Sequence, residues 1–190
     1  MTLFQSKNLT VLLIFIFLHT HSATAADIKA GEKKASLCQG CHGTNGNSKA
    51  PQYPNLADQQ ASYIETQLKA FKSGQRTSSI MQGMAANLNN QEIKDLAAYF
   101  SSLTTETAGG GDISLAKKGQ NKFAMCAGCH GTKAQGRGSF PKLAGQQPEY
   151  LKKQLLHFKD GSRKGGPMNA ISSSLSEQDM SAIAAYLGGL

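Results

Sequence analysis

The stretches "CQGCH" (residues 38–42) and "CAGCH" (residues 126–130) contain all four cysteines of the 190-residue chain. A disulfide inside either cluster would close a very short loop and constrain the unfolded chain little. A structural zinc site needs four protein ligands, but each cluster offers only two cysteines and one histidine, with no second such pair nearby. A thioredoxin-like dithiol would need a βαβ context around the cysteines.

Covalent attachment of haem fits the clusters better than these alternatives. Two thiols three residues apart can add to the two vinyl groups of one porphyrin. The histidine that follows, His42 or His130, then lies beneath the iron as its proximal ligand. We therefore expect two covalently bound haem c groups, with zinc and dithiol chemistry as the weaker alternatives. The attaching thiols would be those of Cys38, Cys41, Cys126 and Cys129.

Both clusters belong to a unit that occurs twice. Up to the histidines, matching residues lie 88 positions apart, and after one deletion the offset is 87 and holds to Leu103 and Leu190. A sustained offset indicates tandem duplication of a complete unit. We place the units at 26–103 and 113–190, joined by the polar, glycine-rich linker 104–112.

The units show helical periodicity. Apolar residues recur at steps of three and four in 89–103, where Asn89 and Glu92 form a capping-box pattern that Ser176 and Asp179 repeat. No alternating or β-branched run is long enough for a strand. We therefore predict an all-α fold of two tandem domains. A second helix is expected in each unit, at 60–73 and at 147–160, and each of these is ended by a glycine. A third helix in each unit is expected to run from about Asp27 or Ser114 into the cysteine cluster.

The sixth position of each iron decides between a carrier and a catalyst, because an open position binds small molecules. A ligand common to both units must lie at matching places, as Met81 and Met168 do at the offset of 87. His157 fails this test, since its counterpart is Ala70. We predict Met81 and Met168 as ligands; the alternative is that they fill equivalent core gaps. Outside the N-terminal segment, the methionines without a matching methionine are Met84, Met125 and Met180.

A proline follows each histidine by about a dozen residues, Pro54 in "YPNL" and Pro141 in "FPKL". Proline fixes φ and lacks an N–H. Its carbonyl can therefore be aimed at the free ring N–H of the histidine, which would orient the ring and raise its basicity. The alternative is that each proline only shapes a turn.

The N-terminal segment has the pattern of an export signal. Residues 9–18 ("LTVLLIFIFL") are a ten-residue apolar run, and "SATAA" (22–26) suits a signal peptidase cutting after Ala25. Ten residues are too few to cross about 30 Å of hydrocarbon, so a retained anchor is the weaker reading. We expect export to the periplasm.

Basic charge is concentrated in the second unit. Residues 26–107 hold 8 Lys or Arg against 7 Asp or Glu, a net charge of +1, whereas residues 108–190 hold 11 against 5, a net charge of +6. This charge either keeps the surface solvated or steers the second unit to an acidic redox partner or an anionic membrane face. Nucleic acid is not expected as a partner, because basic and aromatic residues do not interleave.

The two Cys-x-x-Cys-His motifs, "FPKLAGQ" (140–146), its weaker copy "YPNLADQ" (53–59) and "IMQGMAANL" (80–88) resemble the dihaem cytochromes of the c4 type. The resemblance covers the whole mature chain. It implies two class I cytochrome c domains related by a pseudo-twofold axis, with haems close to the interface, in a periplasmic carrier that can serve a terminal oxidase. The implied ligand sets are Cys38, Cys41, His42 and Met81, and Cys126, Cys129, His130 and Met168.

Two departures from the pattern lie near these ligands but not at them. Asp58 stands where the second copy has Gly145, and "MNAISSSL" (168–175) lacks the glycine that follows Met81 by two residues. The second departure bears on the shape of the chain around Met168.

With histidine and methionine on both faces, the iron has no vacant site for a substrate. Outer-sphere transfer of one electron per haem remains, so we expect a carrier and not an enzyme. One alternative is an electron-transfer subunit of a complex, such as the dihaem subunit of flavocytochrome c sulfide dehydrogenase. Another is a haem enzyme, such as a dihaem peroxidase or thiosulfate dehydrogenase, which would need a labile sixth ligand.

Overall fold

The computed structural model describes residues 25–109 and 111–190, so the predicted signal segment lies outside the described residues except for Ala25. Within the described ranges the regular structure is helical, with two isolated β-bridges. This confirms the predicted all-α fold. The first domain contains α1 (Ile28–Ala35), α2 (Gln39–His42), a 3-10 turn (Thr44–Gly46), α3 (Ala61–Lys72), α4 (Ser79–Ala86) and α5 (Asn90–Ser101). The second contains α6 (Ile113–Phe123), α7 (Ala127–His130), α8 (Pro148–Lys159), α9 (Pro167–Ser173) and α10 (Glu177–Gly188).

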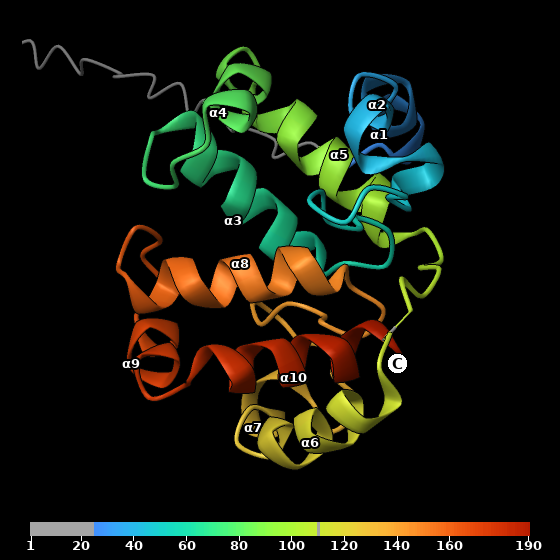
Figure 1. Cartoon of the computed structure of the whole chain (residues 1–190). Helices are drawn as coiled ribbons and strands as arrows, with labels where there is room; N and C mark the ends of the chain where they lie inside the picture. Colours follow the sequence, from blue (N-terminus) through green and yellow to red (C-terminus); the bar gives the residue numbers. More distant parts are fainter. Residues whose placement is uncertain (1–24, 110) are drawn as a thin grey trace, which may run out of the picture.

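In each domain the first helix packs closely on the last (Figure 1), α1 on α5 and α6 on α10. Glycine makes this approach possible. A Cβ on Gly31 would lie 2.1 Å from the carbonyl oxygen of Asp95, and one on Gly119 would lie 1.9 Å from that of Ala182. Backbone meets backbone at these positions, so no larger residue fits without moving a helix.

The helix ends follow from local sequence. Asn89 and Glu92 form the predicted capping box at α5, and Ser176 and Asp179 form the one at α10. Behind these caps the apolar faces of the last helices fill the two cores, with Ile93 and Leu96 in the first domain, and Met180, Ile183 and Leu187 in the second.

Two short helices that the sequence did not predict, α4 and α9, carry the two candidate methionine ligands. Ser78 caps α4 by accepting a hydrogen bond from the N–H of Met81, and α9 starts at Pro167. Gly83 lies inside α4 with no atom within 4 Å of a Cβ placed on it. The missing glycine after Met168 therefore leaves the local structure helical in the second domain.

The domains face each other through α3 and α8, which lie side by side at the centre of the molecule (Figure 1). In the turns that follow these helices, Arg76 and Arg163 form an antiparallel β-bridge between the domains. The two arginines are 87 positions apart, the offset of the internal repeat. The interface thus pairs equivalent residues, as a pseudo-twofold axis requires.

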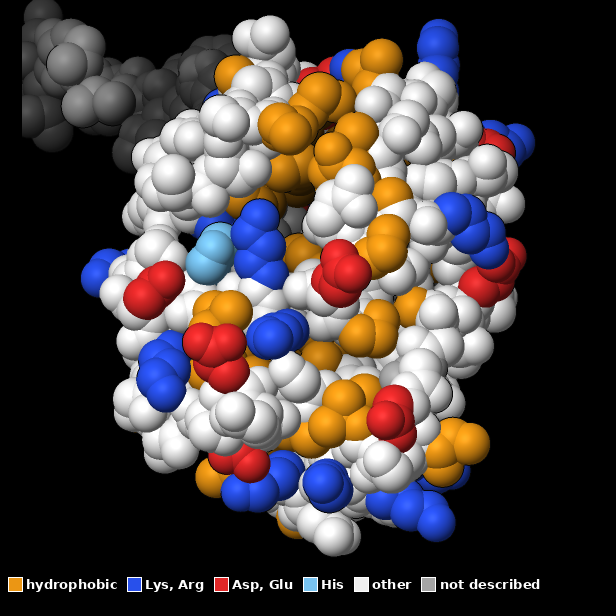
Figure 2. All heavy atoms as spheres, in the orientation of Figure 1, with side chains coloured by type: hydrophobic (Ala, Val, Ile, Leu, Met, Phe, Trp, Pro, Cys, Tyr) orange, Lys and Arg blue, Asp and Glu red, His pale blue; other side chains and the backbone are white. Residues whose placement is uncertain are grey.

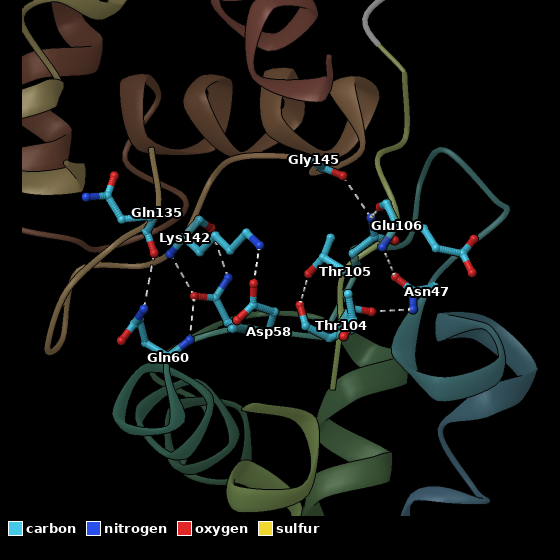
Figure 3. A network of polar contacts seen from close by, with 12 residues as sticks. Asn47, Asp58, Gln60, Thr104, Thr105, Glu106, Gln135, Lys142 and Gly145 are labelled. Carbon is cyan, nitrogen blue, oxygen red and sulfur yellow. Dashed lines mark hydrogen bonds and ion pairs between the residues drawn. The ribbon is translucent and has the colours of Figure 1, made fainter. Parts of the chain in front are cut away.

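The segment predicted as a linker is held by both domains over residues 104–109. Asn47 donates to the carbonyl of Thr104 at 3.0 Å and accepts from the N–H of Glu106 at 2.8 Å, and Thr105 donates to a carbonyl of the first domain (Figure 3). The N–H of Ala108 then donates to the carbonyl of Gly145 in the second domain at 3.2 Å. Residues 104–109 are therefore hydrogen-bonded to both domains.

Among residues 25–109 and 111–190, no helix has the length and apolar character needed to cross a bilayer.

Candidate haem-binding sites

The cysteine clusters form one-turn helices. Cys38 lies at the N-cap of α2, and the N–H of His42 donates to its carbonyl at 2.9 Å; Cys126 and His130 repeat this arrangement at 3.0 Å in α7. The turn therefore places both cysteines and the histidine of a cluster on one short helical segment. Desolvation, reinforced by the second thiol, raises the pKa of Cys38 and of Cys126. No disulfide joins any of the four cysteines.

A glycine directly after each histidine lets the chain turn sharply away. Gly43 has φ +75° and Gly131 has φ +84°, in the left-handed region that side chains disfavour. A Cβ on Gly43 would also lie 2.0 Å from the carbonyl oxygen of Asn47. The turn leads the chain back over the histidine ring to the proline.

Each histidine ring is fixed by a proline carbonyl. Nδ1 of His42 lies 2.9 Å from the oxygen of Pro54, and Nδ1 of His130 lies 2.9 Å from the oxygen of Pro141. Because a carbonyl only accepts, Nδ1 carries the proton and Nε2 keeps its lone pair. Burial lowers the pKa of both rings, and the hydrogen bond to proline opposes that effect. A neutral imidazole with a free Nε2 is the form that binds a metal.

The two methionines occupy matching positions at the start of matching helices. Met81 lies in the first turn of α4 and Met168 in the first turn of α9, and both side chains are partly buried. The unmatched methionines have other surroundings, since Met180 is fully buried in the core while Met84 and Met125 are exposed. That Met81 and Met168 bind the two irons stays a prediction.

The residues present suit a haem. Each domain offers two thiols one helical turn apart, an imidazole with a free Nε2 and a thioether, which are the groups of a c-type haem site. Figure 2 shows hydrophobic side chains gathered around a hollow in the first domain, over the region between α3, α4 and α5. In the part of the chain that the structure describes, no three His, Cys, Asp or Glu side chains converge to hold a metal ion by themselves.

The known proteins that the chain resembles agree with this chemistry. The family model for cytochrome c matches the chain twice, over residues 28–104 and 116–190. Cytochrome c4 of Pseudomonas aeruginosa is 36% identical over 98% of this chain and 100% of its own length. The chain belongs to the dihaem cytochrome c4 family. Its two domains therefore bind two haem c groups covalently, and it is an electron-transfer protein that works with redox partners.

Solved structures and other relatives extend the comparison. Reduced recombinant cytochrome c4 from Pseudomonas stutzeri superimposes with a TM-score of 0.83 at 36% identity, covering 87% of this chain and 100% of that one. A thiosulfate dehydrogenase electron acceptor from Thiomonas intermedia is 32% identical over 87% of this chain and 83% of its own length. The name of this relative describes a protein that accepts electrons from thiosulfate dehydrogenase.

Two glutamines that were not predicted from the sequence lie next to the two sites. Gln59 and Gln146 end the stretches "YPNLADQ" and "FPKLAGQ", and each bonds the backbone just beyond the other domain's proline. Their match at the offset of 87 was a signal that could have identified them.

Proposed function

We propose that the chain is an exported, periplasmic carrier in which each unit, 26–103 and 113–190, holds one six-coordinate haem. Four cysteines attach the two porphyrins, and a histidine and a methionine bind each iron. The bound haem supplies a reversible one-electron couple; the protein fixes its ligands and encloses it. The proposed residues are Cys38, Cys41, His42 and Met81 in the first unit, and Cys126, Cys129, His130 and Met168 in the second.

One observation carries this assignment: the same donor set occurs in both domains. His42 and His130 each bond a proline carbonyl at 2.9 Å through Nδ1, and Met81 and Met168 begin equivalent helices. Thioether ligation raises the reduction potential relative to two histidines. The hydrogen bond to Pro54 or Pro141 makes the imidazole more basic, and a more basic imidazole lowers the reduction potential.

An optical redox titration of the purified holoprotein tests this proposal. We expect two haems per chain, both with a histidine–methionine spectrum, and no reaction of the native protein with carbon monoxide or cyanide at low concentration. Rapid binding of either ligand to one haem would instead indicate an open iron and a haem enzyme.

We further propose that the second domain contacts the acidic partner, for example a terminal oxidase. Lys117 and Lys118 are exposed on α6, and the exposed Met125 precedes Cys126. Exposed cations on the second domain, together with an exposed apolar residue next to a haem-attaching cysteine, suit docking to an acidic surface. Electron transfer to the partner should slow as salt is added, and Lys117→Glu with Lys118→Glu should slow it at low salt. Lys69→Glu, on the first domain, is the control.

Contact with an anionic membrane face uses the same charges and is tested separately. The protein should sediment together with vesicles of anionic lipid at low salt, and it should not sediment with vesicles of neutral lipid. Equal retention by both would exclude an electrostatic contact.

A complex subunit is the second candidate, and the thiosulfate dehydrogenase electron acceptor among the relatives favours it. An acceptor of this kind, or a subunit like that of flavocytochrome c sulfide dehydrogenase, would stay with its enzyme. Size exclusion of native extract separates the two functions, because a free carrier elutes near the mass of the 20.2 kDa chain. The mass of the exported protein also tests cleavage after Ala25.

A further inference from the structure

One peptide group links the first histidine to the second domain. Its carbonyl, that of Pro54, lies 2.9 Å from Nδ1 of His42, and its N–H, that of Asn55, donates to Oε1 of Gln146 at 2.7 Å. The bonds point in opposite directions because the peptide is trans. Nε2 of Gln146 closes the contact by donating to the carbonyl of Asn55 at 2.9 Å.

The second histidine has the same link to the first domain. Nδ1 of His130 lies 2.9 Å from the oxygen of Pro141, and the N–H of Lys142 donates to Oε1 of Gln59 at 2.8 Å. Nε2 of Gln59 donates to the carbonyl of Lys142 at 3.0 Å. The arrangement is therefore reciprocal, since each domain supplies the glutamine that holds the other domain's proline peptide.

The contact of Gln146 with Asn55 is buried and that of Gln59 with Lys142 is partly buried, so water screens both contacts little. Gln59 is 7% exposed, Gln146 is 6% exposed and Asn55 is 4% exposed. In such surroundings hydrogen bonds polarise one another, and a peptide whose N–H donates becomes a better acceptor at its carbonyl. A better acceptor draws more strongly on the imidazole N–H, which makes the ring a stronger electron donor to a bound metal.

We propose that Gln146 is a positioning residue for His42 and Gln59 one for His130, so that each domain sets the reduction potential of the other domain's haem. The proposal rests on the histidines being the iron ligands, as proposed above. Each glutamine lowers the potential of the haem across the interface, because a more electron-rich imidazole stabilises the oxidised iron. A partner that moves the domains apart would raise both potentials together.

The alternative is that these glutamines only hold the domains together, and the chain contains a matched control for this. Gln147 is 7% exposed and donates from Nε2 to the carbonyl of Ser48 in the first domain at 2.7 Å. Gln60 makes the equivalent bond to Gln135 at 3.2 Å (Figure 3). These contacts cross the interface without bonding the proline peptide by a side chain. Their loss should weaken the interface and leave the histidines unchanged.

The test compares Gln146→Met with Gln147→Met in the holoprotein, using redox titrations in which NMR signals of the two haems are followed separately. Gln146→Met should favour reduction of the first haem by about threefold to tenfold, which is about 30 to 60 mV for one electron. The second haem should change less than twofold, and Gln147→Met should change both less than twofold. Gln59→Met should give the reverse pattern, with Gln60→Met as its control.

Three results would overturn the proposal: equal shifts of both haems in Gln146→Met, a shift confined to the second haem, or equal effects of Gln146→Met and Gln147→Met. Gln146→Glu keeps Oε1 as an acceptor, and it should hold the first haem at or below its original potential. This variant provides the test if Gln146→Met does not load haem; a rise in potential in Gln146→Glu would also overturn the proposal.

A second measurement reads the histidine directly. In reduced holoprotein with ¹⁵N-labelled histidine, Gln146→Met should shift the Nδ1–H signal of His42 toward that of a weaker hydrogen bond and leave that of His130 in place. Unchanged potentials and signals, with intact spectra, would refute this inference alone. A haem spectrum that is unaffected by His42→Ala would refute the ligand assignment on which it rests.

Discussion

Arg76 and Arg163 exchange contacts across the pseudo-twofold axis. Nη2 of Arg76 donates to the hydroxyl of Tyr150 at 2.9 Å, and Nη2 of Arg163 donates to the hydroxyl of Tyr63 at 2.8 Å. Burial raises the pKa of Tyr150, but the two guanidinium groups outweigh it and lower that pKa overall. Among the described residues, neither arginine forms an ion pair with a carboxylate, so neutral hydroxyl and amide groups hold both cations.

Arg163→Met should therefore weaken the contact between the domains. The change removes bonds to Tyr63 and to Gln67 and the stacking of the guanidinium on Phe158, 4.5 Å from the ring centroid. Because these hydrogen bonds come from a charged group in a buried site, we expect the free energy of unfolding to fall by about 2 to 4 kcal/mol. Urea unfolding of the holoprotein measures it. The neighbouring exposed Lys164→Met is the control, and an equal effect of both variants would contradict the prediction.

Local sequence was enough to predict the long helices, whereas contacts between domains could not be predicted from it. The capping box at Asn89 depends on residues three apart, and the glycine that ends α3, Gly74, has the φ of +76° that only glycine favours. The bond from Gln146 to Asn55 depends on how two folded units are placed, which periodicity does not record. The helix α4 was missed because it is short and contains Gly83, which lowers helix propensity.

Gly119→Ala should destabilise the second domain strongly. The added methyl group would lie 1.9 Å from the carbonyl oxygen of Ala182 and 2.9 Å from Cβ of Tyr186, so α6 must move away from α10. Overpacking of this kind costs about 3 kcal/mol. Thermal unfolding of the holoprotein should show it.

Gly83→Ala is the matched control, because a Cβ there meets no atom within 4 Å and the position lies inside a helix. Alanine at this position should raise the free energy of unfolding of the first domain by about 0.5 to 1 kcal/mol. If Gly119→Ala were as stable as Gly83→Ala, the close crossing of α6 on α10 would be wrong.

Met168→Ala should open the second iron and leave the first unchanged. The thioether at the start of α9 would be lost, and water or an added ligand would take its place. About half of the sulfur-to-iron absorption should disappear, and the potential of one haem should fall. Met125→Ala, at an exposed methionine, should leave the band intact. A full-strength band in Met168→Ala would remove this residue from the ligand set, and Met81→Ala tests the first haem in the same way.

The carboxylate of Asp179 should make the stability of the second domain depend on pH in the acid range. Hydrogen bonds from Lys122 and from Ser176 lower its pKa to about 2, whereas an aspartate in the unfolded chain titrates near 3.9. The folded state therefore binds fewer protons than the unfolded state between these values. Its contribution is complete above about pH 4 and is lost as the pH falls toward 2.

Asp179→Asn isolates this contribution, because asparagine can still accept the hydrogen bond from the N–H of Ser176 but cannot form an ion pair with Lys122. The difference in urea midpoint between the original protein and the variant should be constant well above pH 4 and should shrink steadily as the pH falls from 4 through 2. Added salt should reduce the part that comes from Lys122, since that side chain is exposed. A difference that stayed the same from pH 2 to pH 5 would show that the charge of Asp179 does not stabilise the fold.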